Sequence, residues 1–423
     1  MTDFDAEICI VGGGLVGLSL AAALGSAGLD TLLLDARPVE EGLKPTFDGR
    51  GSAIARGSSQ ILEALGVWQG CIEGAAPILD IRVSDGRPGE AASPFFLHYA
   101  LTDLDEQERA PGAAPQPMGH IVENRFIRHA LLQRLASLPS VRILAPALVE
   151  RQEQEATRTR LILQDGREIR SSLVVAAEGQ RSSLREAAGI QVARWTYAQI
   201  GVVTTLRHAE PHLGTAHECF LPDGPFAVLP LNDSDEGHHR SSLVWTARAD
   251  AREQIMALDE AAFAEACQRR FGDSLGAFAQ EGARFAYPLN LLLAERFHAP
   301  RLALVGESAH AMHPIAGQGL NLGLRDVAAL AEVLVDARRL GMDPGMPEVL
   351  ERYTRWRRFD SVTLCLVTDS LNRLFSNDIG PLRLARDLGL AAVDRAGPLK
   401  RFFMQHAMGV TGKLPRLTRG EAL

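Results

Sequence analysis

Short apolar runs, each followed by glycines and then by helical periodicity, stand near both ends of the chain. One run covers 6–11 and leads into Gly12-Gly-Gly-Leu-Val-Gly17, after which apolar residues recur at helical spacing to about Ser26. Another run covers 302–305 and leads, through a glycine loop, into a helical pattern that starts near Leu320. Runs of this length are typical of buried parallel strands, and the periodicity that follows is typical of amphipathic helices. The pattern therefore predicts an α/β unit assembled from distant segments.

The middle of the chain has the two-residue period of strands instead. Alternating segments that predict one antiparallel sheet lie at 200–206, 217–222, 226–230 and 242–246, with turns at Asp223-Gly224 and 232–237. A further strand is expected at 79–84, and a helix is expected over 250–271. This part of the chain is interpreted as an α+β substrate domain inserted into the α/β unit.

Beyond residue 340 the chain is predicted to be helical, with helices at about 353–374, 380–393 and 398–408. The predicted division is a discontinuous α/β domain (1–78, 119–190 and 285–345), a substrate domain (79–118 and 191–284) and C-terminal helices (346–423). The chain from Ala331 onward carries a net charge of +4, so the remainder of the −8 total is −12. Basic and bulky apolar residues mixed over 398–408 suit a membrane interface, although a helix docked on its own domain gives the same pattern.

Composition narrows the classes of protein that fit. The chain has 423 residues, of which 46% are hydrophobic and 23% charged, as in ordinary globular proteins. Five scattered cysteines without a C-x-x-C spacing predict reduced thiols, and an acidic start without a signal peptide predicts a cytoplasmic protein. The negative net charge argues against a nucleic-acid binder, and no apolar run is long enough to span a membrane.

The glycine turn after the first strand is a dinucleotide fingerprint in its full context. Gly12 permits the tight turn, Gly14 lets a pyrophosphate approach the backbone, and Gly17 lets the helix pack on the strand. The next strand, 31–34, ends at Asp35, whose carboxylate is expected to bind the ribose hydroxyls of an adenosine. The fingerprint predicts a Rossmann-like domain but does not distinguish FAD from NAD.

The second glycine turn also carries a carboxylate. Glu307 follows the 302–305 run, and His310, His313 and Pro314 lead into the glycine loop. The helix that starts near Leu320 would direct its positive end at a ligand. A metal at the two histidines would need further ligands, so hydrogen bonds within the loop are the preferred interpretation.

Taken together, these motifs resemble the FAD-dependent aromatic hydroxylases of the p-hydroxybenzoate hydroxylase class. The sequence His-Pro-Ile-Ala-Gly-Gln-Gly-Leu-Asn-Leu-Gly-Leu-Arg-Asp at 313–326 is most similar to the ubiquinone-biosynthesis hydroxylases. The family has Asp where this chain has Glu307, and also Asp where it has Glu178 before Gly179. The resemblance also covers the segment around Arg50, at 47–51.

The resemblance implies roles for individual residues. It assigns FAD contacts to Gly12, Gly14, Gly17, Asp35, Arg50, Arg125, Leu148, Glu178, Glu307, Gly319, Leu320 and Asn321. Arg50 would reach the FAD phosphates, the backbone at Leu148 would pass the adenine, and Glu307 would hold the ribitol. A surface-loop arginine at 50, a helix-face charge at 125 and a simple helix cap at Ser182 are the alternatives. No catalytic side chain is assigned, and the candidates for the pocket are His313, Pro314 and Gln318.

The resemblance also implies the chemistry. NAD(P)H would reduce FAD, O₂ would give a C4a-hydroperoxyflavin, and the ring of a polyprenylated phenol would be hydroxylated. An insoluble substrate of this kind would be met at a membrane surface or on a ubiquinone-biosynthesis partner protein. Removing residues 380–423 is then expected to abolish that association and leave FAD bound. A soluble hydroxylase of a small catabolic phenol, and a non-catalytic flavin-bound scaffold, remain alternative interpretations.

Overall fold

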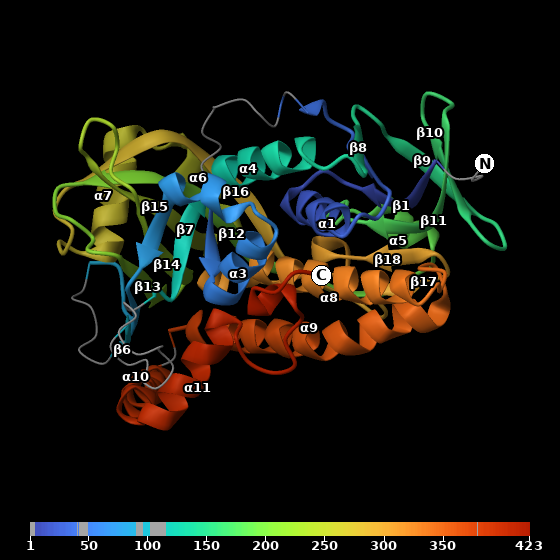
Figure 1. Cartoon of the computed structure of the whole chain (residues 1–423). Helices are drawn as coiled ribbons and strands as arrows, with labels where there is room; N and C mark the ends of the chain where they lie inside the picture. The colour runs from blue at the N-terminus through green and yellow to red at the C-terminus, as the bar shows by residue number, and fades with distance from the viewer. Residues whose placement is uncertain (1–4, 40, 42–49, 90–95, 102–115, 379) are drawn as a thin grey trace.

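The computed structural model describes the chain except for residues 1–4, 40, 42–49, 90–95, 102–115 and 379. Within the described residues, two eight-stranded sheets and one three-stranded sheet form the frame. The first sheet lies at the right of Figure 1 and the second at the left, with long helices crossing beneath them. The mixed α/β class predicted from the sequence is confirmed.

The first sheet is built around strand β1 (Ala6–Val11), which is almost entirely buried. Its strands follow the order β17-β18-β11-β1-β2-β8, and a hairpin of β9 and β10 joins β11. The other members are β2 (Thr31–Leu34), β8 (Val141–Leu144), β9 (Val149–Gln154), β10 (Thr159–Leu163), β11 (Glu168–Ala176), β17 (His298–Ala299) and β18 (Leu302–Leu304). Both β1 and β18 pair in parallel with β11, so the two glycine turns leave the sheet at the same edge.

Helices pack beside this sheet and beside the smaller, three-stranded sheet. They are α1 (Leu15–Ser26), α3 (Arg56–Ala64), α4 (Asn124–Ala136), α5 (Ser183–Ala187), α8 (Gln318–Arg339) and α9 (Pro347–Phe375). Helix α4 begins at Asn124, because the preceding residues Val122 and Glu123 pair in a strand. That strand, β7 (Gly119–Glu123), forms the three-stranded sheet with β3 (Gly51–Ala55) and β4 (Ala75–Ile78).

The second sheet has the order β19-β16-β12-β15-β14-β13-β5-β6. Its strands are β5 (Asp80–Asp85), β6 (Phe96–Ala100), β12 (Val192–His208), β13 (Thr215–Leu221), β14 (Gly224–Leu231), β15 (His239–Arg248), β16 (Phe278–Ala294) and β19 (His310–Ala311). The antiparallel arrangement predicted for the central strands is confirmed, whereas β5 joins β13 in parallel. The domain boundary expected near residue 285 falls inside β16.

The single helix predicted over 250–271 is wrong. The segment forms α6 (Arg252–Ala257) and α7 (Glu260–Phe271), separated by Leu258 and Asp259. The carboxylate of Asp259 accepts a 2.8 Å hydrogen bond from the N–H of Ala262, so Asp259 caps the start of α7. An aspartate in a helical pattern therefore marked a helix start that periodicity alone did not show.

The C-terminal segment forms α9, α10 (Gly380–Arg395) and α11 (Gly397–Met408), close to the helices predicted. The tail after α11 then returns to the first domain. Leu417 is only 1% exposed in its main core, and the indole N–H of Trp356 donates to the carbonyl of Lys413 at 2.9 Å. Among the described residues, no helix combines the length and the apolar character needed to cross a bilayer.

Candidate FAD site

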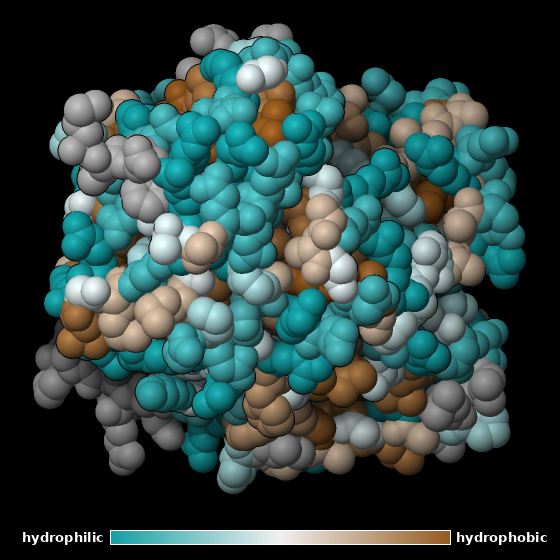
Figure 2. Space-filling model, turned by 90° about the vertical axis from the view of Figure 1, so that its right-hand side faces the viewer, coloured by the Kyte–Doolittle hydropathy of each residue, from teal (hydrophilic) through white to brown (hydrophobic). Residues whose placement is uncertain are grey.

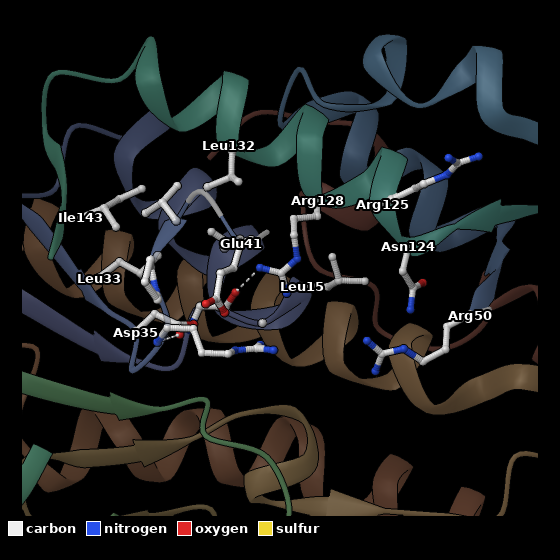
Figure 3. A pocket seen from close by; sticks show the side chains of 16 residues that line it. Leu15, Leu33, Asp35, Glu41, Arg50, Asn124, Arg125, Arg128, Leu132 and Ile143 are labelled. Atoms are coloured by element: carbon white, nitrogen blue, oxygen red, sulfur yellow. Dashed lines mark hydrogen bonds between the residues drawn. The ribbon is translucent and has the colours of Figure 1, made fainter. Parts of the chain in front are cut away.

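A cavity of about 510 Å³ opens above the first glycine turn, between α1, the end of β2 and α4. Asp35 lies at one end of it and Asn124 and Arg50 at the other, as Figure 3 shows. Its lining comprises Gly13, Gly14, Leu15, Leu18, Leu33, Asp35, Arg37, Pro38, Val39, Glu41, Arg50, Asn124, Arg125, Arg128, Leu132 and Ile143. In Figure 3, Leu33, Leu132 and Ile143 lie on the side of Asp35, and Arg50 and Arg125 lie on the opposite side. Apolar and cationic groups in one cavity suit a nucleotide with a base and phosphates.

The glycines of the fingerprint divide into two kinds. Gly12 has φ +114°, and a Cβ there would lie 2.3 Å from the carbonyl oxygen of Ala177. A Cβ on Gly17 would lie 2.0 Å from the carbonyl oxygen of Gly12, so both glycines let backbones meet. A Cβ on Gly14 would meet nothing within 4 Å. The open space at Gly14 is where a phosphate could approach the helix.

Asp35 orients the glycine turn. Its Oδ2 accepts a 2.6 Å hydrogen bond from the N–H of Gly13, and its Oδ1 accepts a 2.8 Å bond from the N–H of Arg37. Each oxygen retains a second lone pair, so hydroxyl groups of a ribose can still donate to this carboxylate.

Helices α1 and α8 both begin without a side-chain cap. Their N-cap residues are Gly14 and Gly317, and neither helix has an acidic residue in its first turn. Gly317 has φ +59°, and a Cβ there would lie 2.9 Å from Cβ of Ala53. Uncapped N-terminal N–H groups favour a negatively charged ligand at both helices.

Basic residues on α4 complete the phosphate end of the cavity. Arg128 lines it and donates to the carbonyl oxygen of Gly13 at 3.0 Å. Arg125 also lines it, with its Nε 2.8 Å from Glu123 and its guanidinium over the ring of Phe126. Arg128 was missed in the sequence, although it lies three residues from Arg125, on the same face of the helix.

Glu307 lies where the two later motifs meet. The side chain of Gln180 hydrogen-bonds its carboxylate, and the hydroxyl of Ser308 donates to the carbonyl of Gly179 at 3.3 Å. Glu307 remains exposed, yet the protein packed around it raises the pKa of its carboxyl. The Gln180 hydrogen bond and the positive charges of His310 and Arg50 oppose that rise. The carboxylate is therefore open to a ligand on one side and supported by protein on the other.

Glu178 does not face that opening. Its two carboxylate oxygens accept from the hydroxyls of Ser182, at 2.6 Å, and Ser183, at 2.8 Å, and from the N–H of Leu184 at 3.2 Å. The hydroxyl of Ser182 in turn accepts from the N–H of Arg185. Glu178 thus caps α5, and the predicted contact with FAD would have to come from its neighbours.

The side chain of Asn321 is also used inside the protein. It accepts from the N–H of Ala55 at 2.9 Å and donates to the carbonyls of Ala53 and Gly317 at 2.8 and 3.2 Å. These bonds tie the start of α8 to β3. Only the backbone at the start of α8 remains for a ligand, and a Cβ on Gly319 there would meet nothing within 4 Å.

Three other predicted site residues, Leu148, Leu320 and Gln318, do not line the cavity. Leu148 is 47% exposed, lies outside the cavity lining, and its carbonyl accepts from the N–H of Gln164 at 2.9 Å. Leu320 packs against the main core, and Gln318 is buried. The segment 47–49 next to Arg50 lies outside the described residues.

His310 and His313 differ sharply. His310 hydrogen-bonds Asp326 at 2.5 Å, as expected for a histidine that holds the loop. His313 is fully buried, and neither ring nitrogen has a hydrogen-bond partner among the described residues, so the same expectation is wrong for it. Burial lowers the pKa of His313 to about 4, although Asp369 opposes this shift, so its ring is neutral at neutral pH. Its ring packs edge-on against Tyr197, at 5.2 Å between centroids.

This arrangement fits FAD. The cavity and the uncapped start of α1 suit its adenosine and phosphates, Glu307 suits its ribitol, and the uncapped start of α8 suits the anionic edge of its flavin.

Comparison with known proteins agrees with this assignment. Residues 5–359 match the family model described as an FAD binding domain. Ubiquinone hydroxylase UbiL of Rhodospirillum rubrum is 48% identical over 425 residues, which cover 100% of this chain and 94% of that protein. The chain belongs to the ubiquinone hydroxylase family of FAD-binding proteins.

Two further comparisons identify a second relative and a solved structure that are similar to this chain. The 3-demethoxyubiquinol 3-hydroxylase of Escherichia coli K12 is 34% identical, over 97% of this chain and 100% of that protein. Among solved structures, p-nitrophenol 4-monooxygenase PnpA of Pseudomonas putida matches with a TM-score of 0.78 and 20% identity, covering 96% of this chain and 98% of that one. At that identity the structural match shows the shared fold.

Proposed function

We propose that this chain is an FAD-dependent monooxygenase that hydroxylates the aromatic ring of a polyprenylated phenol in ubiquinone biosynthesis. NAD(P)H and O₂ are its co-substrates. The observation that carries the proposal is the full-length similarity to a protein named as a ubiquinone hydroxylase. The cavity above the first glycine turn, which suits FAD, supports it.

The protein's own groups bind and orient the cofactor. The start of α1 and Arg128 hold the pyrophosphate, Asp35 the adenosine ribose, and Glu307 the ribitol. The start of α8 favours negative charge at the nearby edge of the flavin. When bound, the flavin carries electrons from NAD(P)H to O₂ and delivers one oxygen atom to the ring.

The segment 312–317 is our candidate for the substrate side of the flavin. It joins β19, at the edge of the second sheet, to α8 in the first domain. Within the part of the chain that the structure describes, the donor and the acceptor nitrogen of His313 have no partner, so a phenolic hydroxyl could use them once the substrate opens this packing. Pro314 and Gln318 are candidates for the same pocket wall.

A prenylated substrate requires access from a lipid phase, and the C-terminal helices present a suitable surface. Exposed apolar side chains on it are Phe359 (80%), Leu366 (55%) and Val367 (46%) of α9, with Phe402 (51%) and Phe403 (43%) of α11. The exposed side chains of Arg355 and Arg373 lie on α9 as well. We propose that this docking surface binds an anionic membrane.

The shape of the molecule is compatible with this surface. Helix α9 runs along the lower side in Figure 1, and α10 and α11 lie at the lower left, near its left-hand end. Figure 2 shows the end of the molecule at the right of Figure 1, away from α10 and α11, and this end is mainly hydrophilic. Flotation with phosphatidylglycerol-containing vesicles tests the proposal. The triple variant Phe359→Ser, Phe402→Ser and Phe403→Ser should lose vesicle binding.

The matched control is Leu213→Ser, which removes another exposed leucine (74%) from a loop of the substrate domain. It should bind vesicles like the wild type. Equal binding by the triple variant would refute the membrane surface, and a wild type that floats only with a partner protein would assign the surface to that partner instead.

The activity itself is tested by stopped-flow spectroscopy and product analysis. NAD(P)H should bleach the flavin, and aerobic turnover should add one oxygen atom to a short-chain prenylated phenol, as mass spectrometry detects. Turnover of prenyl-free phenols alone would favour a soluble catabolic hydroxylase. A bound flavin that NAD(P)H never reduces would favour the scaffold.

A further inference from the structure

A cluster of buried charges lies directly behind Glu307. Asp326 on α8 is fully buried, and its Oδ1 accepts a 2.8 Å hydrogen bond from Nε of Arg357 on α9, which is 5% exposed. Nη1 of Arg357 also binds Asp360 at 2.7 Å. Burial by itself would raise the pKa of Asp326, but the positive charges of His310 and Arg357 outweigh it and hold that pKa below its ordinary value. Asp326 is therefore a carboxylate, with full strength as an acceptor.

The second oxygen of Asp326 holds both ends of the turn that carries Glu307. Oδ2 accepts from the N–H of Gly306 at 3.1 Å and binds Nε2 of His310 at 2.5 Å. Gly306 has φ +57°, a conformation that glycine adopts at little cost. Asp326 thus holds the backbone just before Glu307 and the His310 side chain just after it.

Close packing restricts the space around the turn. A Cβ on Gly306 would lie 3.2 Å from Val16 of α1, and a Cβ on Gly323 of α8 would lie 2.7 Å from the same side chain. The turn is therefore enclosed between α1 and α8. Its orientation depends on the hydrogen bonds to Asp326, because water does not reach this carboxylate to replace them.

We propose that Asp326 is a positioning residue for the cofactor, which fixes the Glu307 carboxylate beside the ribitol through the Gly306 N–H and the His310 ring. Asp326 itself does not touch the cofactor. The inference rests on the proposed function in requiring that the chain binds FAD and that Glu307 holds the ribitol of that FAD.

A double-mutant cycle on FAD affinity tests it. Dissociation constants are measured by titrating FAD into the apoproteins of the wild type, Glu307→Gln, Asp326→Asn and the double variant. Each single variant should bind FAD about tenfold or more weakly, because each disrupts a charge-assisted hydrogen bond. The double variant should bind little worse than either single one, since both changes remove the same contact.

Additive losses in the double variant would overturn the proposal, and would show that Asp326 contributes only general stability. The matched control is Asp360→Asn, which makes the same substitution at the outer partner of Arg357, 38% exposed and away from the turn. It should change FAD affinity by less than about threefold and combine additively with Glu307→Gln.

A second variant keeps the test decisive should Asp326→Asn fail to fold. His310→Gln removes one of the two contacts to the turn and leaves the Asp326–Arg357 pair in place. It should weaken FAD binding, be non-additive with Glu307→Gln and shift the visible absorption of the bound flavin. An unchanged spectrum with additive affinities would contradict the proposal, whereas a wild type that never binds FAD would refute the function instead.

Discussion

The hydroxyl of Ser182 donates a 2.6 Å hydrogen bond to Oε2 of Glu178. That bond belongs to a cap in which Glu178 also accepts from Ser183 and from the N–H of Leu184. The family has an aspartate here, and the longer glutamate reaches three donors at the start of α5. The Glu178 carboxylate is therefore used at the start of α5, and it does not line the cavity.

The substitution Glu178→Ala tests this structural role. It should lower the free energy of unfolding by about 1 kcal/mol, the usual cost of losing a helix cap, and leave FAD affinity within about threefold of the wild type. Thermal unfolding and FAD titration measure the two effects. A large loss of FAD affinity at unchanged stability would assign Glu178 to the cofactor site instead.

Two alanine substitutions in the fingerprint should have opposite effects. Gly12→Ala would bring Cβ within 2.3 Å of the Ala177 carbonyl oxygen at φ +114°, and should cost about 2 kcal/mol of stability or more. Gly14→Ala has open space around Cβ, so it should fold normally and bind FAD at least about tenfold more weakly, because the methyl group occupies the path of the pyrophosphate.

Soluble expression, unfolding curves and FAD titration separate these two cases. Normal FAD affinity in Gly14→Ala would contradict the proposed path of the cofactor over α1. Normal stability in Gly12→Ala would show that the turn adjusts to a side chain.

His313 should make stability fall in acid. Its pKa is lowered from 6.5 to about 4 in the folded protein, so the unfolded chain binds the proton more readily. This contribution is fully present above about pH 6.5 and is lost as the pH falls from there towards 4, by about 1.4 kcal/mol per pH unit.

The variant His313→Leu cannot bind this proton. Its free energy of unfolding, measured in urea at pH 7.5, 6 and 5, should fall less steeply than that of the wild type. Burial also lowers the pKa of His217 to about 4. The variant His217→Leu is therefore measured in the same way for comparison. Parallel slopes for the wild type and His313→Leu would show that His313 does not control this pH dependence.

The C-terminal tail should stabilise the FAD domain. Leu417 is buried in its core, and Arg416 pairs with Asp336 of α8 at 2.6 Å. Removing 414–423 should lower the free energy of unfolding by about 2–5 kcal/mol, the range for losing a buried leucine. Full stability of the shortened chain, in thermal unfolding, would refute this.

The same packing changes how the membrane proposal must be tested. The sequence pattern suggested deleting 380–423 as one unit, with FAD binding left intact. The structure shows that this deletion also removes a core residue of the FAD domain, so loss of membrane binding and loss of folding would coincide. Substitutions at Phe359, Phe402 and Phe403 avoid this difficulty, because these side chains are exposed.

The sequence by itself determined the local structure of this protein and the type of its site. Buried apolar runs predicted β1, β2 and β18, and glycine spacing identified the turn at Gly12–Gly17, because strand burial and backbone strain are set within a few residues. The motifs around Glu307 also pointed to FAD, through resemblance.

The tertiary structure decided which of those residues are available to a ligand. In the fold, Glu178 caps a helix and the Asn321 side chain hydrogen-bonds to β3. Arg128 lines the cavity, and Asp326 pairs with Arg357 behind Glu307. A side chain's hydrogen-bond partners come from segments far apart in the chain. Sequence spacing therefore identifies candidate carboxylate and amide side chains. Only the packed fold determines which of them already have hydrogen-bond partners within the protein.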